Sequence, residues 1–229
     1  MNRYLLPILL LLLLGAQSLY AQRELPPFEP FVHYTMRESM FEEAPTHDGA
    51  IVFLGNSITD HWQWHEYFTP PTGVAILNRG IGGDITAGVL HRMPEIIRHQ
   101  PSKLFLMIGI NDLIGSKPNA QIIANIEHIL SILKSQCPDT KIYLESILPI
   151  NREIFKTDTP SVSTDNIRQV NAELSALAKR MDCTYLDIFS LLIDPETDML
   201  RASYTRDGIH LTAQGYRLWI NEITPLVEK

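Results

Sequence analysis

The sequence predicts an α/β fold, a three-layer α/β/α sandwich built around five parallel strands. Five short apolar runs are spaced along the chain, and continuous apolar runs are typical of strands that are buried on both faces. Stretches with apolar residues at helical spacing separate these runs. Neither an internal repeat nor a long linker interrupts the alternation. Alternating strands and helices predict right-handed βαβ units in one domain, with helices on both faces of the sheet.

Residues 1–21 are interpreted as a secretory signal peptide. Arg3 forms a short positive region, a nearly pure Leu/Ile block covers residues 5–16, and small residues offer cleavage points after Ala21 or after Ser18. The block is shorter than the about 20 residues of a membrane span, so we expect no stable membrane anchor. The exported protein is expected in the periplasm or outside the cell, and the sequence does not choose between the two.

Residues 22–48 are expected to form an N-terminal lead-in with one short helix. The first nine of these residues are rich in proline, which favours an extended chain. Residues 31–43 can form a helix. The residues expected on its apolar side are Phe31, Tyr34, Met40 and Phe41.

Residues 49–229 form the main domain of the prediction. The expected strands cover residues 50–55, 74–78, 103–109, 141–148 and 184–187. The expected helices cover residues 85–99, 120–133, 170–181 and 213–226. Pro118 and Ser163 lie where helix starts are expected. These elements predict a flavodoxin-like sheet.

The composition and charge exclude several classes of protein. Apolar residues make up 45% of the chain and charged residues 20%, which is typical of a globular protein rather than a disordered one. The 19 Lys and Arg residues are outnumbered by 26 Asp and Glu residues, and the formal net charge is -7. Because a nucleic-acid-binding protein normally carries a basic surplus or stripe, no nucleic-acid partner is expected.

The residues that follow the predicted strands have the chemistry needed for acyl transfer. Ser57 follows the first strand and is a candidate nucleophile, which needs a base at neutral pH. His210 can accept the serine proton, and Asp207, three residues earlier, can orient the imidazole. Backbone N–H groups at Ser57 and in the glycine turn ending at Gly83, together with the Asn111 amide, can form an oxyanion hole.

These motifs, in this order, resemble the SGNH (GDSL-type) esterase family over most of the chain after residue 21. The resemblance implies that Ser57 is the nucleophile, that Gly83 and Asn111 belong to the oxyanion hole, and that Asp207 and His210 complete a catalytic triad. It implies a carboxylic ester hydrolase that needs neither a cofactor nor a metal. The sequence of residues 80–84 is most similar to the branch of the family that includes platelet-activating-factor acetylhydrolase subunits and bacterial carbohydrate O-acetylesterases.

One residue departs from the family pattern, because Asn56 stands where an aspartate usually precedes the serine. That aspartate is not the triad acid, so the change concerns the hydrogen bonds of the turn more than catalysis. Candidates for substrate contacts are Trp62, Ile110 and Asp112.

Each motif is weak when taken alone, and the motifs that would compete with this interpretation do not fit the sequence. The nucleophile elbow of α/β-hydrolases would need glycine at Thr59, and a dinucleotide fingerprint would need glycine at Ile85. No phosphate-binding G-K-[ST] loop occurs. His61 and His65 are spaced for a metal on a predicted helix after Ser57, but no third ligand is evident, and a solvated helix face is favoured.

The aromatic residues after Ser57 and the two cysteines each allow two interpretations. Trp62, Trp64 and Tyr67 follow the candidate nucleophile; packing in the core is favoured for at least two of them, and stacking on a sugar is the alternative. Cys137 and Cys183 each precede a predicted strand. Two buried thiols are favoured over a disulfide, which export would permit.

The sequence therefore predicts an exported serine esterase that hydrolyses small acyl esters, with acetyl esters of carbohydrate as the favoured substrate. Hydrolysis of short-chain lipid or phospholipid acyl esters is the first alternative. An inactive carbohydrate-binding relative is the second, although every chemical position holds a competent residue. The alcohol, the acyl-length limit and the oligomeric state stay open.

Overall fold

The computed structural model describes residues 24–229, so the predicted signal peptide lies outside the described residues. Five parallel strands form one sheet in the order β2-β1-β3-β4-β5. Their bounds are β1 (Ile51–Gly55), β2 (Ile76–Gly80), β3 (Lys103–Met107), β4 (Lys141–Glu145) and β5 (Thr184–Leu186). Every residue of β1 and β3, two of the three interior strands, is buried, as their continuous apolar runs predict. The predicted sandwich with five parallel strands is confirmed.

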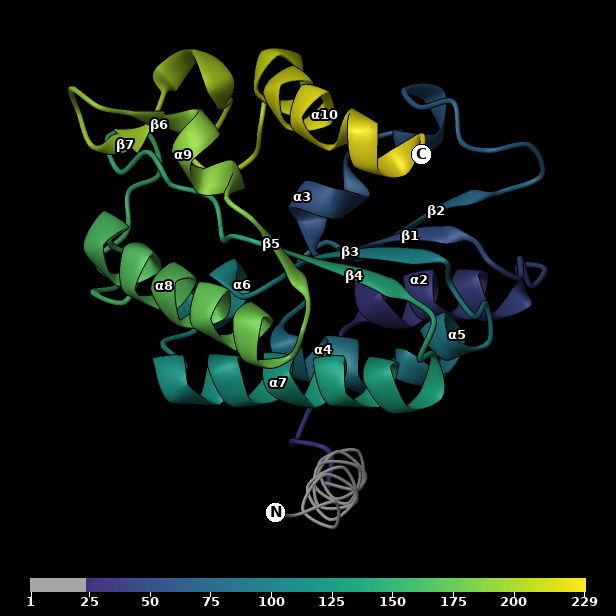
Figure 1. Cartoon of the computed structure of the whole chain (residues 1–229). Coiled ribbons are helices and arrows are strands. Elements are labelled where there is room, and N and C mark those ends of the chain that lie inside the picture. Colours follow the sequence, from purple (N-terminus) through teal and green to yellow (C-terminus); the bar gives the residue numbers. More distant parts are fainter. Residues whose placement is uncertain (1–23) are drawn as a thin grey trace, which may run out of the picture.

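Helices cover both faces of this sheet (Figure 1). Helices α9 (Ile188–Leu192) and α10 (Ala213–Val227) lie over one face. The opposite face is covered by α4 (Thr86–His91), α5 (Met93–Ile97), α7 (Asn119–Gln136) and α8 (Thr164–Arg180). Pro118 and Ser163 are the residues that precede α7 and α8, and the Ser163 hydroxyl accepts a hydrogen bond from Asn166 N (3.2 Å). Both predicted helix starts are therefore correct.

The expected helix over residues 85–99 is divided in two at Arg92. Arg92 has φ -99° and ψ 11°, outside the helical range. Pro94 lies in the first turn of α5, where its missing amide hydrogen costs no helical hydrogen bond. Helix α9 and the hairpin of β6 (Ile193–Asp194) and β7 (Met199–Leu200) were not predicted, because they are too short to show a periodic pattern.

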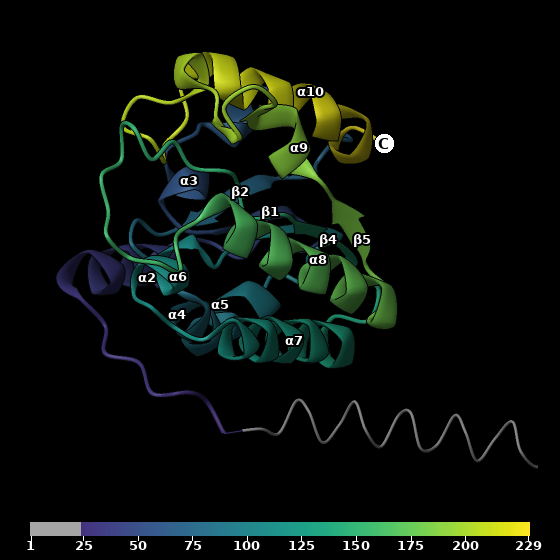
Figure 2. The same ribbon diagram turned by 90° about the vertical axis from the view of Figure 1, so that its left-hand side faces the viewer.

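Helix α2 (Val32–Glu43) lies beside the β2 edge of the sheet, at the opposite edge from β5 (Figure 2). Of the residues expected on its apolar side, Tyr34 and Phe41 are buried. Phe31 and Met40 are 37% and 55% exposed, so that part of the prediction is wrong. The two buried residues form a small core of their own with Ile81 and Phe28.

The segment after β1 does not form the expected helix through Tyr67. Helix α3 (Ser57–Asp60) ends after one turn, and a separate 3-10 turn, η1 (Trp64–Glu66), follows. Trp64 is fully buried and stacks on Phe53, with ring centroids 4.2 Å apart. The tertiary packing of this indole outweighs the local helical pattern.

Between residues 24 and 229 no helix is long and apolar enough to cross a membrane. The two cysteines are not bonded to each other: Cys137 is buried and Cys183 is half-buried. The favoured reading of two thiols holds, although only Cys137 is fully enclosed.

Candidate active site

Ser57 lies at the edge of the sheet where the parallel strands end, the edge that faces the viewer in Figure 2. It follows β1 and begins α3. Asn56 Oδ1 accepts a hydrogen bond from Ile58 N (3.0 Å), so asparagine supplies the turn hydrogen bond that its departure from the family pattern had called into question. Gly80, at the end of β2, allows α3 to approach closely, because a Cβ at this position would collide with the backbone of Asp60.

Ser57, His210 and Asp207 form a continuous chain of contacts. Ser57 Oγ lies 2.8 Å from His210 Nε2, although the two residues are 153 positions apart in the sequence. His210 Nδ1 lies 2.7 Å from Asp207 Oδ2. When Nδ1 carries the proton toward the carboxylate, Nε2 is left as an acceptor that faces the serine hydroxyl.

Backbone hydrogen bonds hold Asp207 in its place. Its Oδ1 accepts hydrogen bonds from Ile209 N (3.1 Å) and His210 N (2.8 Å). Burial raises the pKa of Asp207, but the hydrogen bonds from His210 and Ile209 outweigh burial, so this pKa lies below its ordinary value. Asp207 is therefore ionised at neutral pH, as a group that stabilises an imidazolium must be.

A second imidazole, which the sequence reasoning did not connect with the site, borders His210. The rings of His61 and His210 have centroids 4.9 Å apart, and Arg206 Nη2 lies 3.2 Å from His61 Nδ1. Desolvation lowers the pKa of His61, and the neighbouring His210 and Arg206 lower it further. His61 is therefore neutral at neutral pH and adds no charge beside His210.

The turn after β2 carries Gly83, the predicted oxyanion glycine. Asp84 N donates a hydrogen bond to Ile81 O (3.1 Å) and closes a β-turn in which Gly83 has φ +84°. A positive φ at this position favours glycine. Asn111 lies in α6 (Ile110–Ile114), after β3, and its Nδ2 donates to Asp84 O (2.8 Å). This bond uses one of the two amide hydrogens of Asn111 and fixes the amide beside the turn.

A buried ion pair behind this turn was missed by the sequence reasoning. Arg92 Nε and Nη2 lie 2.9 Å and 2.8 Å from Asp84 Oδ2. Arg92 also donates to the carbonyl oxygens of Arg79 (2.8 Å) and Gly55 (3.0 Å), near the ends of β2 and β1. Burial raises the pKa of Asp84 to about 6, although Arg92 opposes this rise. The signal in the sequence was Arg92 itself, a charged residue within the apolar helical pattern of residues 85–99.

The three candidates for substrate contacts lie elsewhere than expected. Ile110 and Asp112 are buried, and Asp112 accepts hydrogen bonds from Thr86 N (3.0 Å) and Thr86 Oγ1 (2.6 Å). Both predictions are wrong, because the first turn of α6 directs these side chains into the fold. Trp62 is half-buried and stacks on Tyr216, with centroids 4.3 Å apart. Trp62 and Trp64 therefore pack, as favoured.

Tyr67 is 48% exposed and lies against Trp62, with ring centroids 4.7 Å apart. In residues 24–229 no group of three or more His, Cys, Asp or Glu side chains is arranged to hold a metal ion. His61 and His65 do not share a helix, since α3 ends at Asp60. The helical spacing that suggested a metal pair therefore does not apply to these two histidines.

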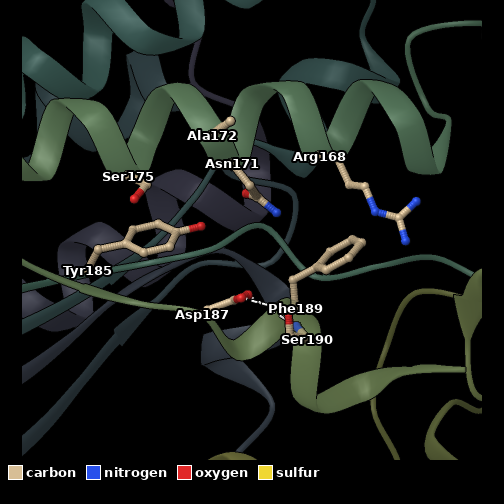
Figure 3. Close-up of a pocket in the computed structure, with 8 residues that line it drawn as sticks. All are labelled: Arg168, Asn171, Ala172, Ser175, Tyr185, Asp187, Phe189 and Ser190. Atoms are coloured by element: carbon tan, nitrogen blue, oxygen red, sulfur yellow. Dashed lines mark hydrogen bonds between the residues drawn. The ribbon is translucent and has the colours of Figure 1, made fainter. Parts of the chain in front are cut away.

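Two cavities lie near the strand ends. One, of about 540 Å³, adjoins the glycine turn and has Gly83 in its wall. The other, of about 300 Å³, lies between α8 and α9 beside β5 (Figure 3). Its polar residues include Arg168, Asp187 and Ser190, and Asp187 accepts a hydrogen bond from Ser190 Oγ (2.6 Å). It has no predicted site residue in its wall.

Comparisons with known proteins identify the family of the chain. The model of the GDSL-like lipase/acylhydrolase family matches residues 53–218. Platelet-activating factor acetylhydrolase IB subunit alpha2 of Rattus norvegicus is 27% identical over 173 residues, which are 72% of this chain and 70% of that protein. An acylhydrolase structure from Bacteroides fragilis is 25% identical, covers 87% of this chain and 98% of its own, and has a TM-score of 0.73.

An acetylxylan esterase from Geobacillus stearothermophilus is similar in fold. It is 15% identical, the alignment covers 80% of this chain and 95% of that one, and the TM-score is 0.64. At this level of sequence identity, the similarity shows a shared fold.

Proposed function

The chain belongs to the GDSL-like lipase/acylhydrolase family and is a carboxylic ester hydrolase, and we propose that Ser57, His210 and Asp207 are its catalytic triad. The observation that carries this proposal is the unbroken chain of short contacts from Ser57 Oγ through both ring nitrogens of His210 to the Asp207 carboxylate. A nucleophile, a base and an orienting acid in this order are the requirement for serine catalysis.

The reaction begins when Ser57 Oγ attacks the ester carbonyl carbon and its proton passes to His210 Nε2. The carbonyl oxygen becomes an oxyanion, toward which the N–H groups of Ser57 and Gly83 and the Asn111 amide donate. The intermediate collapses when the bond to the alcohol oxygen breaks and His210 returns the proton to that oxygen. Water, deprotonated by His210, then attacks the carbonyl carbon of the acyl-enzyme. The bond from that carbon to Ser57 Oγ breaks, His210 returns the proton to Oγ, and the acid is released.

The favoured substrate is an acetyl ester of a carbohydrate. Two observations support this choice: a wide cavity adjoins the oxyanion turn, and charged as well as aromatic side chains line it. A fold of this kind also carries the acetylxylan esterase of Geobacillus stearothermophilus. Export through the segment of residues 1–21 is part of the proposal, supported by Arg3 and the apolar block that follows it.

Replacement of the nucleophile or the base tests the mechanism. Ser57→Ala and His210→Ala are each expected to lower kcat for p-nitrophenyl acetate by at least about 10³-fold, because the two residues act as one unit. Circular dichroism and thermal unfolding should match the wild type. A folded Ser57→Ala variant that keeps substantial turnover would contradict the serine mechanism.

Acetate release from an acetylated xylo-oligosaccharide, compared with p-nitrophenyl esters of increasing acyl length, tests the substrate. We expect acetate release and a preference for acetyl. Activity that peaks at eight or more carbons without acetate release from the sugar would favour a lipid ester instead. N-terminal sequencing of the exported protein should find Gln22 as the first residue, or Leu19 where cleavage follows Ser18, and an intact Met1 would contradict the signal peptide.

A further inference from the structure

The N-terminal segment of residues 24–43 builds part of the active-site wall, although it precedes the matched family region, residues 53–218. This segment consists of the lead-in, residues 24–31, and helix α2. A Cβ placed on Gly83 would lie 3.2 Å from Cζ of Phe31, and one on Gly82 would lie 3.3 Å from Nε2 of His33. The segment therefore touches the oxyanion turn itself.

Hydrogen bonds and ring packing anchor this wall to the elements that follow β1 and β2. Tyr34 donates a hydrogen bond to Gly88 O (2.9 Å) in α4, and Arg37 Nη2 lies 2.7 Å from Asp60 Oδ1 in α3. The ring of Phe28 packs edge-on against Tyr34, with centroids 4.7 Å apart. An element tied at both α3 and α4 holds its side chains at a fixed position relative to Ser57 and the glycine turn.

The cavity of about 540 Å³ lies between this wall and the body of the protein. The lead-in supplies Phe28, Glu29 and Phe31 to its lining. The body supplies Gly83, Ile85 and Lys117, the last from the loop between α6 and α7. Clefts of this volume are typical of small-molecule sites, and this one shares Gly83 with the proposed oxyanion hole.

We propose that this cavity is a sugar subsite, in which a pyranose ring of the substrate packs on Phe31 while Lys117 and Glu29 hydrogen-bond its hydroxyl groups. The inference rests on the proposed function and deepens it. Phe31 offers a partly exposed ring, and the two charged side chains offer an ammonium donor and a carboxylate acceptor. An acyl chain needs only apolar walls, whereas a sugar needs an apolar face together with donors and acceptors.

Two substrates that differ only in the alcohol separate this subsite from the catalytic centre. Ethyl acetate has no ring to occupy the cavity, and an acetylated xylo-oligosaccharide has several. Phe31→Ala and Lys117→Ala are each expected to raise KM for the oligosaccharide about tenfold, which is a larger change than either variant causes in the hydrolysis of ethyl acetate. Met40→Ala is the matched control, because Met40 is exposed on the adjoining helix α2 but is absent from the cavity lining.

A binding measurement gives a readout that does not depend on turnover. The deacetylated xylo-oligosaccharide should inhibit ethyl acetate hydrolysis by the wild type competitively, and the inhibition constant should rise about tenfold in Phe31→Ala but not in Met40→Ala. Equal losses on both substrates would show that Phe31 only supports the fold of the turn and would overturn the subsite.

Failure of the subsite and failure of the proposed substrate give different results. A wild type that cleaves ethyl acetate but neither cleaves nor binds the oligosaccharides would refute the carbohydrate substrate. A wild type that cleaves both, with an unchanged KM in both variants, would refute the subsite alone. A KM that rises in Phe31→Ala only for p-nitrophenyl octanoate would assign the cavity to an acyl chain.

Discussion

At the scale of single residues, the hydrogen bond between Ser57 and His210 joins positions that are 153 residues apart. The sequence could propose this pair, because each residue lies in a motif whose chemistry is useful only beside the other. The sequence could not predict the ring of His61 beside His210, because His61 follows a helix that ends after one turn. Only the early end of α3 brings His61 to this position.

Asn111 should contribute to kcat rather than to substrate affinity. Asn111→Ala is expected to lower kcat by about 10²–10³-fold with little change in KM, because it removes one fixed donor to the developing oxyanion. Steady-state kinetics with p-nitrophenyl acetate provides the measurement. A raised KM with unchanged kcat would instead assign Asn111 to the binding of the ground-state substrate.

Ile110 and Asp112 show where residue-level prediction failed. Their neighbour Asn111 is half-buried and reaches the turn, while the residues on either side of it are buried. Successive residues of a helix point in directions about 100° apart, so neighbours of a site residue do not share its orientation. Choosing substrate contacts by closeness in sequence ignores this rotation.

At the scale of elements, the strand bounds were predicted to within a few residues, but the helices were predicted less well where tertiary contacts decide them. Apolar spacing marks α7, α8 and α10 because each has one face against the sheet. The same spacing runs through α4 and α5 and conceals the break at Arg92. At this break the Arg92 guanidinium donates hydrogen bonds to the carbonyl oxygens of Arg79 and Gly55, at the ends of β2 and β1.

Loss of the Arg92 guanidinium should destabilise the region that joins these elements. Arg92→Met is expected to lower the free energy of unfolding by about 3–5 kcal/mol, since it leaves the Asp84 carboxyl group buried without its cation. The double variant Arg92→Met/Asp84→Asn should regain part of this loss. Urea unfolding measures both, and identical stabilities of the single and double variants would contradict the coupling.

A second buried carboxyl group lies between the sheet and α10. Glu145, at the end of β4, is buried and accepts a hydrogen bond from Trp219 Nε1 (2.6 Å). Burial raises its pKa from 4.5 to about 8, although the Trp219 bond opposes the rise. Between these two values the unfolded chain is ionised at this residue, while the folded protein holds it protonated.

Rising pH should therefore destabilise the fold through Glu145. Since the folded pKa is the higher one, the unfolded state binds fewer protons, and the free energy of unfolding decreases from about pH 5 to about pH 8 by on the order of 2–4 kcal/mol. In Glu145→Gln, which keeps an acceptor for Trp219, this contribution to the decrease should disappear. Urea unfolding at both pH values tests it, and equal pH dependence in variant and wild type would contradict it.

At the scale of the whole molecule, the parallel arrangement of the strands explains why most residues of the candidate site could be predicted from the sequence. All five strands run in the same direction, so the residues that follow them gather at one edge whatever their separation in the sequence. Ser57, Gly83 and Asn111 were located by that rule. The contact of the N-terminal segment with the glycine turn was not predictable in this way. Helix α2 lies outside the sheet, beside β2, and neither its sequence pattern nor the strand order indicates where it packs.

The course of α10 has a practical consequence for handling the protein. The helix starts three residues after His210 and runs back along the sheet, and the chain ends far from the strand ends that carry Ser57 (Figure 1). There Lys103 Nζ, at the start of β3, donates to the carbonyl oxygen of Val227 (3.1 Å). A peptide tag or a resin linkage joined to Lys229 therefore leaves the mouth of the site open to a polymeric substrate. The same attachment at Glu24 would instead extend from the N-terminal segment, which forms part of the wall of the site.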